Sequence, residues 1–129
     1  MAFSYCTSLT SITIPNNVTS IEDSLFEYCT SLPSINIPNG VTSIGSKAFL
    51  GCASLANVTI PADVTSIGGY AFSACSGLTS VTFQGAIASS RFDSEAFSGS
   101  GNLRDKYFDA NGGIGTYVRA KGGSAWSKQ

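Results

Sequence analysis

The sequence predicts an α/β solenoid, in which short coils of chain stack one upon another and share a continuous core. Two observations support this prediction. Equivalent residues recur at a strict interval of 23, most clearly the phenylalanines Phe3, Phe26, Phe49 and Phe72. Within each unit, the spacing of apolar residues also changes from the period of a strand to that of a helical turn. Fixed-period repetition of this kind is typical of stacked-coil proteins.

Further columns of residues keep the same interval. They are a cysteine column (Cys6, Cys29, Cys52 and Cys75), a leucine column (Leu9, Leu32, Leu55 and Leu78), a β-branched column (Ile12, Ile35, Val58 and Val81) and a proline column (Pro15, Pro38 and Pro61). Because so many columns agree, chance does not explain the repetition.

Each unit predicts the same series of elements. In the first unit, residues 9–14 nearly alternate apolar and polar and include β-branched residues, which predicts a strand with one buried face. Pro15 ends this strand, because proline has no N–H to donate to a sheet. Residues 18–21 predict a second short strand. In the third unit, Phe49 and Cys52 lie three residues apart, which predicts a helical turn with both side chains on one side.

One unit cannot enclose a core, because a single strand and a single helical turn leave their apolar edge in water. Stacking the units at the ~4.8 Å spacing of paired strands turns each apolar column into a buried ladder. The main strands then form a parallel sheet. A stable stack usually needs roughly three repeats or more, and this chain has about four before the pattern decays.

The decay of the repeat predicts two regions. Gln84 replaces the expected proline, and the next Ala96–Phe97 pair arrives after 25 residues instead of 23. We expect Phe92 to occupy the slot of Ile67 across this insertion. The solenoid then covers residues 1–103, as about four repeats plus one degenerate repeat, and a C-terminal capping segment covers residues 104–129. For that segment we expect a short helix followed by a hairpin, the atypical cap that a solenoid needs.

The unit Leu-x-x-Ile-x-Ile-Pro-x-x-Val-x-x-Ile-Gly-x-x-Ala-Phe-x-x-Cys resembles the BspA-type leucine-rich repeat, also called the Treponema pallidum class, over residues 2–103. The resemblance implies a right-handed leucine-rich-repeat coil with a parallel β-sheet face, and short second strands and helical turns on the other side. It also implies a bacterial cell-surface or secreted protein, whose relatives bind host matrix proteins, host cells or other microbes.

Composition argues against several classes of function. Only 12% of the residues are charged, against about 25% in a typical domain, and the chain contains no histidine. Nucleic acid is therefore not an expected partner, and nucleophile–histidine pairs are excluded. The one close group of carboxylates in the repeats, Glu22, Asp23 and Glu27, is expected to be solvated. We expect no enzyme activity, no catalytic residue, no metal site and no cofactor. No apolar run is long enough for membrane insertion.

The four cysteines predict buried free thiols, because one cysteine per coil at a single column is a core pattern. Zinc and redox sites need paired Cys-x-x-Cys spacings, which are absent. The coil spacing does fall within the Cα separation of a disulfide, so a Cys6–Cys29 or Cys52–Cys75 bridge is not excluded by distance. The parallel Cβ directions that stacking imposes argue against such a bridge.

The outward positions of the main strands form an uncharged polar ladder, which we identify as the candidate partner-binding surface. Its residues are Ser11, Thr13, Ser34, Asn36, Asn57, Thr59, Ser80 and Thr82. Solenoids commonly bind partners on such a sheet face. A second interpretation is that these side chains merely keep the sheet soluble, because the ladder lacks the Trp, Tyr and Arg that dominate binding hot spots.

The two ends of the chain offer other candidates. Residues 91–129 have six bases against four acids and contain Tyr117, Arg119 and Trp126, which are candidate contacts for a partner. Trp126 is also a candidate anchor of the cap. At the N-terminus, an uncapped first coil would expose strand edges. We therefore expect either a homo-oligomer formed through this end or upstream repeats that cover it.

Two functions of different classes follow. The first is a non-enzymatic adhesion module whose ligand is a protein or a surface glycan. The alternative is a structural spacer or self-assembling repeat unit with no ligand of its own.

Overall fold

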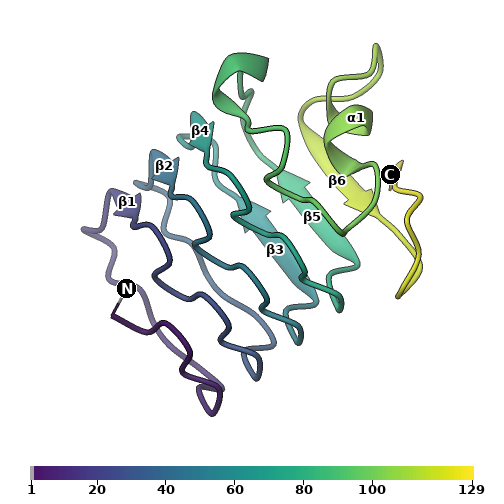
Figure 1. The fold of residues 1–129 in the computed structure, drawn as a ribbon. Coiled ribbons are helices and arrows are strands. Elements are labelled where there is room, and N and C mark those ends of the chain that lie inside the picture. The colour runs from purple at the N-terminus through teal and green to yellow at the C-terminus, as the bar shows by residue number, and fades with distance from the viewer. Residues whose placement is uncertain (1) are drawn as a thin grey trace.

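A computed structural model describes residues 2–129 and shows the chain as a stack of coils that progresses from the N-terminus to the C-terminus (Figure 1). Two sheets run along the stack. The first contains β1 (Ser20–Ile21), β2 (Ser43–Ile44) and β4 (Ser66–Ile67), and the second contains β3 (Asn57–Ile60), β5 (Ser80–Phe83), β6 (Gly115–Val118) and β7 (Ser127–Lys128). Two short helices complete the fold, a 3₁₀ helix η1 (Ser89–Arg91) and α1 (Leu103–Tyr107).

The strands pair in parallel at the interval of 23 that the sequence predicts. In the first sheet, Ile21 pairs with Ile44, and Ile44 pairs with Ile67. A bridge between Ile67 and Phe92 continues this line, which confirms that Phe92 occupies the isoleucine slot across the insertion. In the second sheet, β3 and β5 pair in parallel over their whole length.

The main-strand sheet is shorter than predicted. Residues 9–15 of the first coil form no strand, and the second coil contributes only a bridge between Ser34 and Asn57. Pro33 gives a physical reason for this difference. Its equivalents Ala56 and Thr79 each donate a backbone N–H to the preceding coil, whereas a proline has none to donate.

The predicted helical turns are wrong. Residues 46–51 form tight turns, and residues such as Tyr28, Lys47 and Tyr70 have φ near 60°, outside the helical region. The amide of Phe49 donates to Ala71 in the next coil at 2.7 Å, so it is not part of a helical hydrogen-bond series. Amides along the turn alternate between partners within the turn, as from Leu50 to Lys47, and partners in the next coil, as from Phe49 to Ala71.

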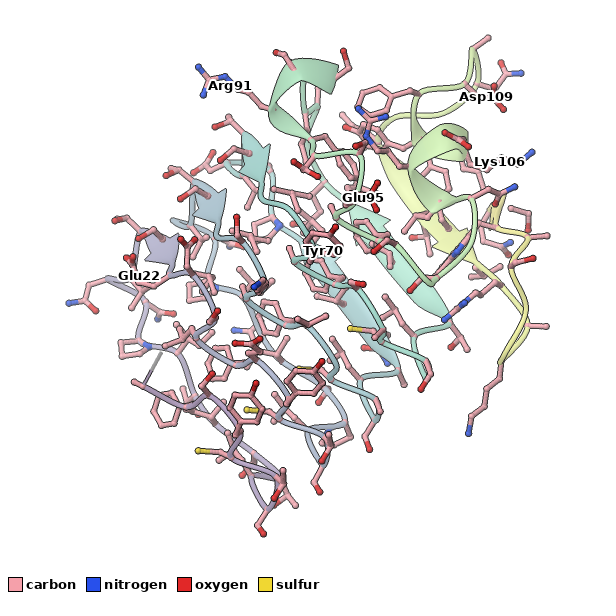
Figure 2. The ribbon with its side chains drawn as sticks, in the orientation of Figure 1. Glu22, Tyr70, Arg91, Glu95, Lys106 and Asp109 are labelled. Atoms are coloured by element: carbon pink, nitrogen blue, oxygen red, sulfur yellow. The ribbon has the colours of Figure 1, made fainter. Side chains whose placement is uncertain are left out.

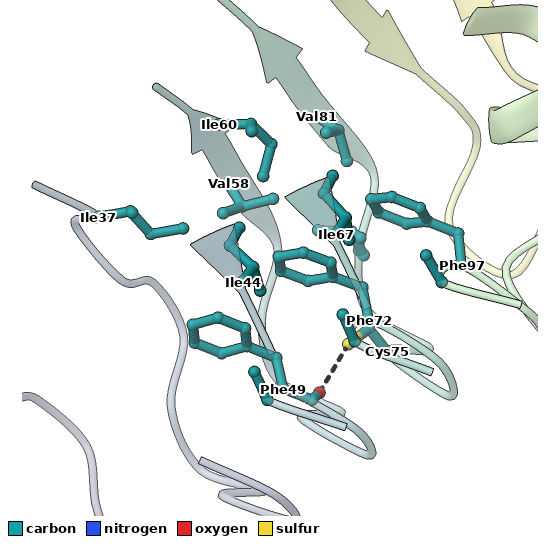
Figure 3. Packing of buried hydrophobic residues seen from close by; sticks show 14 of the residues in the cluster. Ile37, Ile44, Phe49, Val58, Ile60, Ile67, Phe72, Cys75, Val81 and Phe97 are labelled. Carbon is teal, nitrogen blue, oxygen red and sulfur yellow. Dashed lines mark hydrogen bonds between the residues drawn. The ribbon is translucent and has the colours of Figure 1, made fainter. Parts of the chain in front are cut away.

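The phenylalanine column forms one continuous file through the core. Successive rings are stacked, with centroids 5.6, 5.4, 5.0 and 5.0 Å apart from Phe3 through Phe26, Phe49 and Phe72 to Phe97. Figure 3 shows Phe49, Phe72 and Phe97 in this file beside the isoleucines of the short strands. The arrangement confirms the predicted stacking of equivalent residues into a shared core.

The cysteine column contains free thiols, as predicted, and three of the four are buried. The Cys52 thiol donates to the carbonyl of Phe26 at 3.2 Å. The Cys75 thiol donates to the carbonyl of Phe49, also at 3.2 Å (Figure 3). Burial raises the pKa of the Cys52 thiol to about 12, and burial likewise raises the pKa of Cys75. Such thiols act as small apolar residues and are poor nucleophiles.

The C-terminal segment covers the last coil. Strand β6 pairs antiparallel with the outer edge of β5, and β7 pairs antiparallel with β6. In α1, the buried Tyr107 uses its hydroxyl to accept from the amide of Ile87 at 2.9 Å and to donate to the carbonyl of Gly85 at 3.2 Å. These contacts join the end of the chain to the coil that contains the insertion.

Ser100 stands near the position of the next cysteine, and its fully buried hydroxyl has no hydrogen-bond partner among residues 2–129. An orphaned buried hydroxyl costs about 1–3 kcal/mol. We expect Ser100→Ala to leave the free energy of unfolding unchanged or to raise it by up to about 1 kcal/mol. The control is Ser73→Ala, because the Ser73 hydroxyl donates to the Ser98 carbonyl at 2.9 Å and its loss should destabilise the protein. Urea unfolding that ranks the two variants the other way would contradict this account.

Candidate functional site

The polar ladder lies along the outer face of the main-strand sheet. The alternation within β3 positions it, because Val58 and Ile60 are buried while Asn57 and Thr59 are exposed. Six of the eight predicted residues are exposed: Ser11, Thr13, Ser34, Asn36, Asn57 and Thr59. Ser80 and Thr82 are half-buried, because strand β6 pairs with β5 beside them.

The C-terminal end of the ladder is occupied by the chain itself. Strand β6 places Thr116 opposite Thr82, and the two side-chain oxygens are hydrogen-bonded at 2.8 Å. Thr82 is therefore less able than the other members to bond a ligand. The accessible part of the ladder belongs to the first three coils.

A shallow hollow of about 370 Å³ lies at the centre of the ladder. We call it the amide hollow, because its polar lining consists of the neutral side chains of Ser34, Asn36, Asn39, Asn57, Thr59 and Gln84. The apolar part of its lining comes from Ile35, Ile37 and Pro61. Four of the predicted ladder residues thus meet at one place.

Two residues of the amide hollow, Asn39 and Gln84, lie outside the predicted ladder. Asn39 follows Pro38 at the corner that leaves the main strand, outside the alternating positions of the strand. Gln84 replaces proline in its column, and this break in the repeat is the sequence signal that distinguishes it.

The six polar side chains of the amide hollow are all exposed, so a ligand can reach them. Other hydroxyls on the coils are committed to the backbone, as in the bonds from Thr42 to Thr19 and from Thr79 to Ala56. The amide hollow therefore concentrates polar side chains that are accessible for hydrogen bonding to a ligand.

The tail residues predicted as partner contacts are placed differently. Tyr117, Arg119 and Trp126 are all buried, so they do not present an exposed recognition surface. The indole of Trp126 donates to the Ser100 carbonyl, and the Tyr117 hydroxyl donates to Gly113 at 2.7 Å. Among the two interpretations of Trp126, the structure favours the anchor of the C-terminal segment.

Arg119 binds backbone carbonyls of the last coils. Its guanidinium donates to the carbonyls of Leu78 at 2.6 Å, Gly123 at 2.7 Å, Ser100 at 3.2 Å and Cys75 at 3.2 Å. It also lies 5.1 Å from the ring centroid of Trp126. Burial lowers the pKa of Arg119. The residue that composition suggested for a partner therefore satisfies carbonyl groups where the regular coils end.

The turn side of the coils exposes tyrosines that the sequence analysis did not single out. The rings of Tyr5 and Tyr28 are stacked with centroids 5.2 Å apart, and Tyr28 also lies against Gly51, where a Cβ would collide with its ring. Tyr70 is likewise exposed on the turn of its own coil, where Figure 2 labels it. These tyrosines lie away from the amide hollow in the repeat.

The carboxylate group of the second coil has structural partners. Glu22 accepts a hydrogen bond from the Ser20 hydroxyl at 2.7 Å, and Asp23 accepts one from the Ser46 amide at 2.8 Å. Both side chains are exposed. Within the described chain, no three His, Cys, Asp or Glu residues are grouped to hold a metal ion. No helix formed by residues 2–129 has the length and apolarity to cross a membrane.

The stacked coils and their shared core define the chain as a leucine-rich-repeat protein. A family model for the BspA type leucine rich repeat region matches residues 1–118 in six copies. The chain belongs to this family, as its sequence resemblance predicted. Leucine-rich-repeat modules generally serve protein interaction, and the family gives no indication of catalysis. No curated protein matches the chain.

Three solved structures are similar to this chain. A leucine rich cell surface protein from Faecalibacterium prausnitzii is 45% identical, with a TM-score of 0.63, over 65% of this chain and 22% of that one. The T. pallidum leucine rich repeat protein is 38% identical, with a TM-score of 0.58, over 59% and 36%. A leucine-rich repeat protein from Bacteroides ovatus is 38% identical, with a TM-score of 0.61, over 67% and 23%. The match therefore spans only 22% to 36% of these longer proteins.

We expect Arg119→Met to lower the free energy of unfolding by about 3 kcal/mol, because it removes several charged hydrogen bonds and leaves buried carbonyls without donors. The matched control is Arg91→Met, since Arg91 is exposed and its replacement should change the free energy by less than about 0.5 kcal/mol. Chemical denaturation measures both. Equal stability of the two variants would show that Arg119 does not hold the C-terminal segment.

Proposed function

We propose that the chain is a non-enzymatic adhesion module of a bacterial cell-surface or secreted protein, and that it binds a host or microbial macromolecule through the polar ladder. The ligand is a protein or a surface glycan. The observation that carries this proposal is the amide hollow, where six neutral, exposed polar side chains converge.

The position of these side chains supports a binding role. Asn57 and Thr59 belong to β3, which is paired with β5 on one side and bridged to Ser34 on the other. Side chains held on a rigid sheet lose little conformational freedom when a ligand binds, so more of the interaction energy appears as affinity. We propose further that the solenoid coil is right-handed and that residues 104–129 cap it.

Two further points support the location. The chain belongs to the BspA-type family, and one similar structure is described as a leucine rich cell surface protein. The cell-surface location is a property of that protein, and we extend it to this chain as part of the proposal.

The alternative function, a self-assembling repeat unit or spacer, is favoured by one observation. The first coil has a mainly apolar hollow of about 210 Å³, with Phe3, Ile12 and Leu25 in its lining. Such a surface fits a homo-oligomer formed through the N-terminal end or a further coil packed on it. This function does not require the polar ladder.

The test replaces Ser34, Asn36, Asn57 and Thr59 with lysine and measures binding of the fluorescently labelled protein to epithelial monolayers and to bacterial cells. We expect the unmodified protein to bind at least one of these surfaces, and the variant to lose that binding. The reason is that four long charged side chains would fill the amide hollow and disturb its neutral lining. These four positions are exposed, so a native circular dichroism spectrum is expected.

The matched control carries lysine at Ser8, Asn17, Ser54 and Ser90, which are exposed residues outside the ladder. It adds the same charge and should retain binding. Equal binding by both variants, or no binding of the unmodified protein to either surface, would contradict the adhesion function. Concentration-dependent assembly in light scattering would then favour the alternative.

A further inference from the structure

We propose that the amide hollow is a binding site for a neutral, hydroxyl-rich saccharide. This inference rests on the proposed function, because it names the ligand chemistry of the same face. Of the two ligand classes proposed above, protein and surface glycan, it selects the glycan. A glycan carried on a protein would satisfy it as well as a free one.

Hydrogen-bonding capacity is the first argument. Asn36, Asn39, Asn57 and Gln84 each offer two N–H donors and a carbonyl acceptor, and the hydroxyls of Ser34 and Thr59 both donate and accept. A matching ligand must donate and accept at closely spaced points. Sugar hydroxyl groups have this property, and they are arranged on neighbouring carbons in a saccharide ring.

Charge is the second argument. No residue in the lining of the amide hollow is charged. A carboxylate, phosphate or sulfate would enter without a cation to offset its desolvation, and a cationic ligand would enter without a carboxylate. The lining therefore disfavours ions of either sign and favours a neutral ligand.

The apolar part of the lining is the third argument. The amide hollow has little apolar surface, because Ile35, Ile37 and Pro61 of its lining are buried. Its ligand must therefore be held mainly by hydrogen bonds, which suits a hydroxyl-rich saccharide better than an apolar molecule. A protein partner usually inserts a large anchor into a deep pocket, and the amide hollow provides neither a deep pocket nor an aromatic residue of its own.

Size agrees with a short saccharide segment. Known small-ligand pockets occupy about 300–1,000 Å³, and the amide hollow, at about 370 Å³, lies at the lower end of this range. It is lined by residues of three successive coils, from Ser34 to Gln84. A segment of a longer glycan could therefore bind there while the rest of the chain continues along the ladder.

The test uses the side-chain amide resonances of ¹⁵N-labelled protein. Lactose, maltose, cellobiose and N-acetyllactosamine are the neutral probes, and free N-acetylneuraminic acid and a heparin disaccharide are the charged ones. We expect at least one neutral probe to shift the side-chain resonances of Asn36, Asn39, Asn57 and Gln84 in a saturable manner. The charged probes should leave them unchanged. If all four neutral probes leave these resonances unchanged, the saccharide proposal is wrong.

A matched pair of variants tests the assignment. Asn57→Asp keeps the shape of the side chain but removes its N–H donors and adds a charge, so we expect at least about a tenfold loss of saccharide affinity. Asn111→Asp makes the same chemical change at an exposed residue outside the lining and should bind as the unmodified protein does. Backbone spectra report whether each variant is folded. Equal affinity of the two folded variants would place the saccharide elsewhere and overturn the proposal.

Cell binding separates this inference from the function on which it rests. Periodate oxidation of the target cells destroys glycans, and protease treatment removes proteins. If the lysine ladder variant loses binding but periodate has no effect, the surface binds a protein, so the adhesion function stands and the saccharide proposal fails. If the lysine variant binds as well as its control, the adhesion function itself fails.

Discussion

The hydrogen bonds between neighbouring coils and the ring stacking of their equivalent residues are the constraint on which the rest of the structure depends. Phe49 illustrates both. Its ring lies between those of Phe26 and Phe72, and its amide donates to Ala71 in the next coil. A coil of 23 residues has no interior of its own, so each coil obtains its burial and much of its hydrogen bonding from its neighbours.

Strict register also explains where the molecule departs from regularity. Pro33 interrupts the main-strand sheet because it lacks an N–H, and Arg119 binds carbonyls of Leu78 and Gly123 where the regular coils meet the C-terminal segment. Gln84, which breaks the proline column, contributes to the amide hollow. The irregular residues thus end the sheet, hold the C-terminal segment or line the candidate site, while the regular columns build the scaffold between them.

The sequence predicted the parts of the fold that depend on periodicity. It identified the file of phenylalanines, the parallel register, the buried thiols and the place of Phe92. It failed for the turns, because φ values near 60° at Lys47 and Tyr70 depend on contacts with adjacent coils. It placed four ladder residues that line the amide hollow but missed Asn39 and Gln84, since a hollow depends on how corners from several coils converge. Arg119 was assigned to a partner surface because composition does not show which way a side chain points.

Deletion of one whole period tests whether registered stacking of the coils holds the protein together. Removing residues 47–69 joins Ser46 to Tyr70 and takes out 23 residues, so every remaining column stays in register. We expect this variant to keep a cooperative urea unfolding transition, with lower stability than the intact chain. Removing only residues 47–57, about half a period, should abolish the transition because it puts the columns out of register. Loss of the transition in both deletions, or its survival in both, would contradict the claim that registered stacking holds this protein together.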